Sequence, residues 1–357
     1  MNQKEKELFL ELCAYCDPNR AKLKKLLDGG NATSGVLGLL FANRMAGVAY
    51  HVLKRTGMLD QVDREFRVSI RNASLLNEKL NEDHLGCVKF LTAELDACGI
   101  PYALLKGAYL CQRYPKGCRT SNDVDVLLAP EDVGKVSARL KMAGFRQGYM
   151  KNEGFVAATR QQIIESKMTR GETVPFIRET RLPYLKHLEV DLNFSLDYKN
   201  SDDASLKSML SRTQTVTLGE AKIRVLEPMD FLLHLCAHLY KEATTLPWIR
   251  MRRDMTFYKY CDIYALMQGW EEQDLERLLH RAEELRMRLE LLYCLGSVEA
   301  FFDMPLLRCI RPTPEEARAL REVTAPAEKK TYRYREPNPV RSFFAKDRME
   351  LLEEVAG

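Results

Sequence analysis

Hydrophobic and polar positions divide the chain into two helical ends and a central part with strand-like alternation. Apolar residues recur every three or four positions over 34–57 and 63–98, which predicts helices up to about residue 97. The same spacing returns from residue 227 onward. Towards the end, the Pro- and charge-rich stretch 311–339 indicates an irregular connector, and the apolar positions of 341–355 predict a closing helix.

Between these ends the hydrophobic period changes to that of strands. Short apolar or alternating runs at 100–105, 123–128 and 187–196 predict strands, and residues 145–162 indicate a hairpin or two short strands. Ala129-Pro130-Glu131-Asp132 is typical of a helix start. We therefore expect an α/β core at 98–226, an N-terminal helical domain at 1–97 and a C-terminal helical domain at 227–357.

The most informative stretch is LLKGAYLCQRYPKGCRTSNDVDVLL, residues 104–128. Asp123 and Asp125 are two positions apart on a predicted strand, so their side chains point to one face about 7 Å apart. Two carboxylates beside a hydrophobic core repel each other, and a divalent ion such as Mg²⁺ removes that repulsion. A D-x-D at a strand end is also a common turn or cap feature, so the pair by itself leaves both interpretations open.

Neighbouring residues favour the metal site. Lys106 and Gly107 occupy a strand-to-helix turn, where backbone N–H groups can hold an anion. Arg119 and Ser121, just before the acids, offer a guanidinium and a hydroxyl to phosphate oxygens. A second alternating strand, HLEVDLN at 187–193, carries further acids on one face.

Gly107, the D-h-D-h motif at 123–126 and Asp191 within Val-Asp-Leu resemble the signature of the polymerase β-like nucleotidyltransferase superfamily. More narrowly, LLKGAYL, SNDVDVLL and EVDLNFSL resemble the bacterial uncharacterised nucleotidyltransferase family. The resemblance covers about residues 95–265. It implies an α/β (α+β) fold: a nucleotidyltransferase core with a mixed sheet, flanked by N-terminal and C-terminal helical domains.

The resemblance also implies the chemistry. Asp123, Asp125 and Asp191 would coordinate two Mg²⁺ ions that clamp a nucleoside triphosphate, with ATP as the default expectation. Gly107 and Ser121 would lie against the phosphates, with Lys106 and Arg119 as charge partners. A nucleoside monophosphate would then pass to an acceptor, and pyrophosphate would leave.

Three features depart from the family pattern or leave a choice open. Ala108 stands where the superfamily has Gly or Ser, and Asn193 stands where the narrower family often has His. Glu189 shares the face of Asp191 and is the alternative third ligand. Asn cannot act as a base, so a His-assisted step is not expected from this strand.

Other groups of residues can be explained by structural roles as well as by functional ones. His234 and His238 are four apart on one helix face, a spacing that binds zinc with a third ligand, but the face is otherwise apolar and favours a structural role. Cys13 and Cys16 form a CxxC without a second pair. The stretch 248–262, with several Arg and aromatic residues and Asp262, fits either an acceptor pocket or a solvated helix end. An RNA acceptor would use the same residue types.

Composition narrows the classes further. The chain has 357 residues, 46% of them hydrophobic, and a net charge of +4, which predicts an ordinary folded protein and gives no support for nucleic-acid binding. No stretch has the length and apolar character of a membrane span, and ten scattered cysteines indicate free thiols, so we expect a cytoplasmic protein.

The expected function is therefore Mg²⁺-dependent nucleotidyl transfer. The acceptor is left open among a small molecule, a protein and a tRNA, and we expect it to bind in a cleft between the core and the C-terminal helices. Two alternatives remain: a phosphotransferase that moves the γ-phosphoryl group, and a non-catalytic nucleotide-binding protein of the same fold.

Overall fold

The computed structural model describes residues 1–152, 154–196, 202–304 and 310–355. By their internal contacts these residues form two compact units, Asn72–Phe231 and Met1–Arg71 together with Leu232–Gly357. The predicted division at residues 97 and 226 into three domains stays a prediction.

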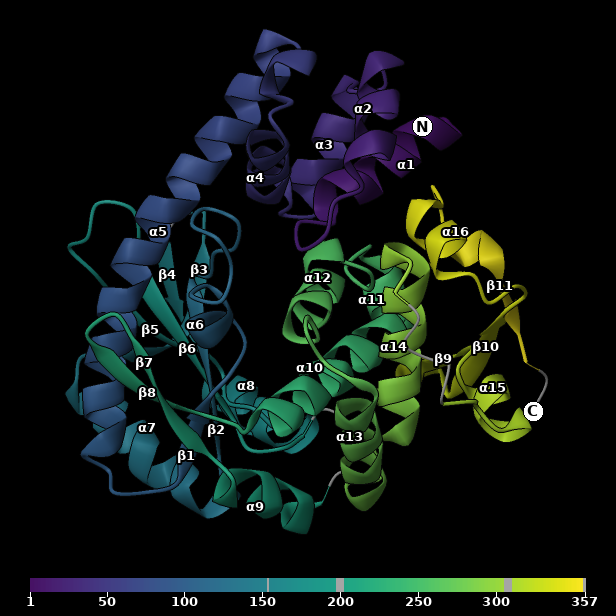
Figure 1. The fold of residues 1–357 in the computed structure, drawn as a ribbon. Coiled ribbons are helices and arrows are strands. Elements are labelled where there is room, and N and C mark those ends of the chain that lie inside the picture. The colour runs from purple at the N-terminus through teal and green to yellow at the C-terminus, as the bar shows by residue number, and fades with distance from the viewer. Residues whose placement is uncertain (153, 197–201, 305–309, 356–357) are drawn as a thin grey trace. The chain divides into compact units, whose positions relative to one another are not determined.

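The first unit is built on an eight-stranded mixed sheet with the strand order β4-β3-β5-β6-β2-β1-β8-β7 (Figure 1). The pairs β2·β6 and β1·β8 are parallel, and the other neighbours are antiparallel. The strands are β1 (Tyr102–Leu104), β2 (Asp123–Leu128), β3 (Arg146–Lys151), β4 (Gly154–Ala157), β5 (Phe176–Glu179), β6 (His187–Asn193), β7 (Gln214–Leu218) and β8 (Ala221–Val225). The helices of this part of the chain are α5 (Arg64–Asp96), α6 (Gly107–Leu110), α7 (Val133–Met142), α8 (Arg160–Thr169) and α9 (Asp203–Ser211).

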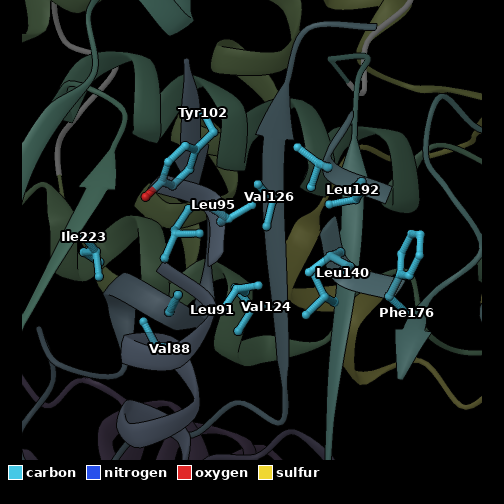
Figure 2. Packing of buried hydrophobic residues seen from close by; sticks show 14 of the residues in the cluster. Val88, Leu91, Leu95, Tyr102, Val124, Val126, Leu140, Phe176, Leu192 and Ile223 are labelled. Atoms are coloured by element: carbon cyan, nitrogen blue, oxygen red, sulfur yellow. The ribbon is translucent and has the colours of Figure 1, made fainter. Parts of the chain in front are cut away.

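One face of this sheet is buried against helices. Figure 2 shows apolar side chains of α5 and α7 packed on Val124 and Val126 of β2 and on Leu192 of β6. Because side chains alternate between the two faces of a strand, Asp123 and Asp125 of β2 must lie on the opposite face. The predicted α/β core with a mixed sheet flanked by helices is confirmed.

The second unit is mainly helical. Its helices are α1 (Gln3–Cys13), α2 (Arg20–Asp28), α3 (Ser34–Ala42), α4 (Ala46–Thr56), α10 (Pro228–Ala243), α11 (Leu246–Arg250), α12 (Phe257–Leu266), α13 (Glu272–Glu284), α14 (Arg288–Phe302), α15 (Pro314–Ala319) and α16 (Pro339–Phe344), with α10 beginning four residues earlier in the other unit. Phe9 of α1 contacts Phe257 of α12 and Phe343 of α16, with ring centroids 5.0 and 5.5 Å apart. Residues from both ends of the sequence therefore share one core. None of the helices in the described ranges has the length and apolar character needed to cross a membrane.

Two predictions for the C-terminal part are wrong. The stretch predicted as an irregular connector contains α15 and the strands β9 (Glu322–Ala325) and β10 (Lys330–Tyr334). The predicted closing helix ends at Phe344, and β11 (Leu352–Glu354) then pairs with β10. The alternate residues Val323 and Ala325 enter a small core with Leu352. The apolar positions of this region therefore alternate with a period of two, as in a strand, although charged residues lie between them.

Candidate active site

The predicted acids lie on neighbouring parallel strands, on the face of the sheet opposite the helix-covered core. In the β2·β6 pair, Asp125 is in register with Asp191, and Asp123 is in register with Glu189. Neighbouring strands lie about 4.8 Å apart, so each pair of carboxylates starts from adjacent backbone positions. The structure thus places Asp125 beside Asp191 and Asp123 beside Glu189, with all four on one face of the sheet. The predicted roles of Asp123, Asp125 and Asp191 stay a prediction.

The glycine turn between β1 and α6 lies against the segment that leads into β2. A Cβ atom on Gly107 would lie 2.2 Å from Ser121 Oγ and 2.4 Å from Ser121 Cβ, closer than any side chain tolerates. The preceding residue, Lys106, has a positive φ of 45°, a conformation that is costly for a residue with a Cβ. Glycine is therefore required at position 107 by the close approach of Ser121.

Hydrogen bonds and charges connect this turn to the acids. Ser121 Oγ donates to Asp123 Oδ1 at 2.6 Å, and Lys106 Nζ lies 3.1 Å from Asp125 Oδ1. Asn193 Nδ2 donates to the same Asp125 oxygen at 3.3 Å. Two of these contacts therefore join predicted site residues in pairs, Ser121 with Asp123 and Lys106 with Asp125.

Arg119 is also part of this region. The residue is only 6% exposed, and its guanidinium donates to the backbone carbonyl of Thr120. Its charge helps to lower the pKa of Asp123. The structure therefore places Arg119 near the first acid; its predicted role as a phosphate contact stays a prediction.

The three acids differ in their electrostatic surroundings. Burial alone would raise the pKa of Asp123, but the hydrogen bond from Ser121 and the charges of Lys106 and Arg119 outweigh burial, and this pKa is lowered. Burial and the charge of Asp125 raise the pKa of Asp191 well above its usual range, with Glu189 and Glu172 adding to the effect. Asp123 thus has compensating partners, whereas the groups that act most strongly on Asp191 are other carboxylates.

The donor set is chemically suited to a divalent metal ion. Carboxylate oxygens are the ligands that Mg²⁺ prefers. Burial, and after it the repulsion from neighbouring carboxylates, raises the pKa of Asp191 and of Glu189, and a cation would relieve that repulsion. In the described part of the chain, no three His, Cys, Asp or Glu side chains are already arranged closely enough to form a metal site. The carboxylates therefore fit the ion by chemistry and register, and the choice between Asp191 and Glu189 as third ligand stays open.

The other candidate side chains His234, His238 and Asp262 belong to the helical unit. His238 Nε2 is 3.2 Å from Glu242 Oε1, and Glu242 also forms an ion pair with Lys259, so the second histidine contacts the carboxylate of that ion pair. Asp262 is 2% exposed, in the interior of the helical unit. The nine described cysteines are free thiols, and Cys309 lies outside the described residues. The predicted acceptor cleft stays a prediction.

Residues of α5 also contact the site, and none of them is among the predicted site residues. Asn81 binds the backbone carbonyl of Arg119, in the segment that leads into β2, and His84 binds that of Asp123, the first residue of β2. Their spacing on one helix face was the available signal, but polar residues on a long helix usually indicate a solvated face.

Mg²⁺-dependent enzymes hold the ion between one or two carboxylates and the substrate phosphates. Acids on adjacent strands, beside a turn whose N–H and ammonium groups can bind phosphate, fit that arrangement. The chain belongs to the uncharacterised nucleotidyltransferase family, whose model matches residues 32–303. This confirms the predicted family and the enzyme class, a nucleotidyltransferase; the expected bacterial source stays a prediction. A nucleotidyltransferase-like antigenic protein from Paracoccidioides brasiliensis has a crystal structure that aligns over 62% of this chain and 98% of its own, with 16% identity and a TM-score of 0.34. No curated protein matches the chain.

Proposed function

We propose that this nucleotidyltransferase uses a divalent ion, Mg²⁺, to transfer a nucleoside monophosphate from a nucleoside triphosphate, ATP by default, to an acceptor hydroxyl or amine, with release of pyrophosphate. The observation that carries the proposal is the in-register pair Asp125 and Asp191 on β2 and β6, with Asp123 on the same face beside the Gly107 turn. A cytoplasmic location is part of the same proposal.

Each residue has a distinct task in this proposal. The three carboxylates would hold the ions, which supply charge neutralisation at the phosphates and activation of the attacking group when bound. Lys106, now against Asp125, would move its ammonium group to the triphosphate, while Ser121 keeps Asp123 ionised and oriented. Positioning and electrostatic stabilisation would then account for most of the rate.

Binding of Mn²⁺ and α,β-methylene-ATP, which cannot undergo transfer at the α-phosphorus, tests the site by calorimetry. Asp125→Asn and Asp191→Asn should each weaken binding at least about tenfold, since each removes one charged ligand. Glu189→Gln is the matched control on the same strand and face, and a near-normal affinity would assign the third ligand to Asp191. Wild-type affinity in both Asp variants would refute the proposed site.

Labelled ATP tests the reaction. With a cell extract as the source of acceptor, we expect label from the α-phosphate in the acceptor and label from the γ-phosphate in pyrophosphate. Label from the γ-phosphate in the acceptor would instead identify a phosphotransferase. Nucleotide binding without either product in extracts, with added tRNA included, would favour a non-catalytic protein. Mass spectrometry of the labelled product would then distinguish a small molecule, a protein and a tRNA as acceptor.

A further inference from the structure

A row of polar side chains on α5 binds the backbone that carries the first acid. Asn77 Nδ2 donates to the carbonyl of Gly117 at 3.0 Å, and Asn81 Nδ2 donates to the carbonyl of Arg119 at 2.6 Å. His84 Nε2 lies 3.0 Å from the carbonyl of Asp123. A carbonyl oxygen only accepts, so this histidine nitrogen carries the proton and donates.

The geometry of α5 matches the geometry of this segment. Positions 77, 81 and 84 are spaced by four and three, so their side chains share one helix face. Gly117, at the start of the segment, has a positive φ of 78°, and a Cβ there would lie 2.3 Å from Ser74 Oγ on the same helix. The segment therefore lies directly on α5, with three of its carbonyls bound to side chains of that helix.

A fourth residue of α5 binds the backbone of the segment just before β6, the second strand that carries an acid. Asp83 Oδ2 accepts hydrogen bonds from the backbone N–H groups of Tyr184 at 2.7 Å and Leu185 at 3.0 Å. These residues come just before β6, the strand that carries Asp191. One helix thus binds the backbone on the approach to both strands of the site.

We propose that Asn77, Asn81, Asp83 and His84 are positioning residues of the active site: by holding the approaches to β2 and β6 on α5, they set the position of the acids and of Ser121. This inference rests on the proposed function for its consequence, but its structural part stands on the contacts alone. In irregular segments that lack such bonds, the backbone groups form hydrogen bonds with water instead, so the side chains of these segments are poorly fixed. Here a helix that packs on the sheet core provides the fixed reference.

Amide hydrogen exchange of the protein without ligand tests the structural part. In Asn81→Leu, which removes the donor to Arg119, exchange of the amides in 117–123 should accelerate about tenfold, the effect expected from losing one buried hydrogen bond. Thr92→Val is the matched control: it lies on the same helix, and its buried Oγ1 has no hydrogen-bond partner among the described residues. We expect less than a twofold change there.

A second pair of variants distinguishes loss of the His84 hydrogen bond from a general loss of packing. His84→Gln keeps an N–H donor near the carbonyl of Asp123, whereas His84→Leu removes it; exchange in 117–123 should accelerate about tenfold in His84→Leu only. Unchanged exchange in both Asn81→Leu and His84→Leu would overturn the inference. Equal acceleration at Ile223, in the sheet core, would also overturn it, because the residues would then act on global stability.

Binding of Mn²⁺ and α,β-methylene-ATP connects the segment to the site. We expect Asn81→Leu and His84→Leu to weaken binding about tenfold, with Thr92→Val and His84→Gln near the wild-type affinity. Accelerated exchange with wild-type affinity would refute the positioning role. If the wild-type protein fails to bind the nucleotide at all, the proposed function fails, and the exchange data still decide whether α5 holds the two segments.

Discussion

Gly107→Ala tests the closest approach in the site. The added methyl group would lie 2.2 Å from Ser121 Oγ and 2.4 Å from Ser121 Cβ, whereas non-bonded carbon atoms prefer about 3.5–4.0 Å. Rotation of the Ser121 side chain moves Oγ but leaves Cβ in place. The backbone of one segment must therefore shift by roughly 1 Å or more.

The expected loss follows from two effects. Overpacking of this kind costs about 1–3 kcal/mol, and displacement of Ser121 also breaks its 2.6 Å hydrogen bond to the Asp123 carboxylate, a type of bond worth about 1.5–3 kcal/mol. Because the two effects share one residue, they are not additive, and we expect the free energy of unfolding to fall by about 2–4 kcal/mol. Urea unfolding measures this loss directly.

A second substitution distinguishes this explanation from a general intolerance of alanine. Ser121→Gly removes both colliding atoms and leaves Ser121 Cα at 3.8 Å, an ordinary contact distance. In the Ser121→Gly background, Gly107→Ala should therefore cost less than about 1 kcal/mol. Ser121→Ala keeps the Cβ at 2.4 Å and should give no such relief. Wild-type stability of Gly107→Ala, or equal relief from both serine substitutions, would refute the reasoning.

Three further predictions concern charged groups. Lys106→Met removes the cation next to the acids. Calorimetry should then show that Mn²⁺ alone binds at least about threefold more tightly, because the lysine no longer competes with the ion, and that α,β-methylene-ATP binds more weakly. Weaker binding of Mn²⁺ alone would contradict this competition. Burial raises the pKa of Glu290, so the folded state holds this proton more tightly than the unfolded chain, and stability is lost as pH rises from the ordinary carboxyl range towards that raised pKa. Glu290→Gln should therefore unfold at higher urea than wild type at pH 8 and gain less at pH 5, whereas Glu276→Gln, at an exposed position, should change little at either pH. Arg348→Met leaves the fully buried Asp254 without its partner at 2.8 Å and should cost about 3 kcal/mol in urea unfolding, with a smaller loss when Asp254→Asn is added; an equal loss in the double variant would show that the charge is not responsible.

The sequence was sufficient to predict the two strands that carry the acids. DVDVLL and HLEVDLN alternate acids with apolar residues, and that alternation determines both the strand period and the face on which the acids lie. It did not determine the pairing register, so the choice between Asp191 and Glu189 was open, and the structure places both on one face, opposite Asp125 and Asp123 respectively. Register depends on contacts between distant segments, which a single sequence does not contain.

Two features could not be predicted from local pattern for a different reason. The contact between Gly107 and Ser121 joins a helix start to an irregular segment fourteen residues later, and only the three-dimensional approach shows why glycine is needed. The small C-terminal sheet does not follow from the sequence pattern because charged residues are interspersed along its short strands, and Val323, Ala325 and Leu352 are the strand residues that are fully buried in its core. With so few buried positions, composition outweighs periodicity as a signal.

The two acids of the site, Asp123 and Asp191, differ in their neighbours: Asp123 has a hydroxyl donor and cations beside it, whereas the charged groups that act on Asp191 are other carboxylates. Asp123 has its pKa lowered by a hydroxyl donor and nearby cations, so it is ionised before any ligand arrives. The pKa of Asp191 is raised by burial and by neighbouring carboxylates, and the β2·β6 register places the backbone of Asp191 beside that of Asp125. A protein gains no stability from holding acids in this way, and such arrangements persist where a charged partner is bound. The same reasoning explains why α5 would hold both approaches: without fixed backbone segments, the acids would move apart to reduce their repulsion, and the favourable site for a cation would be lost.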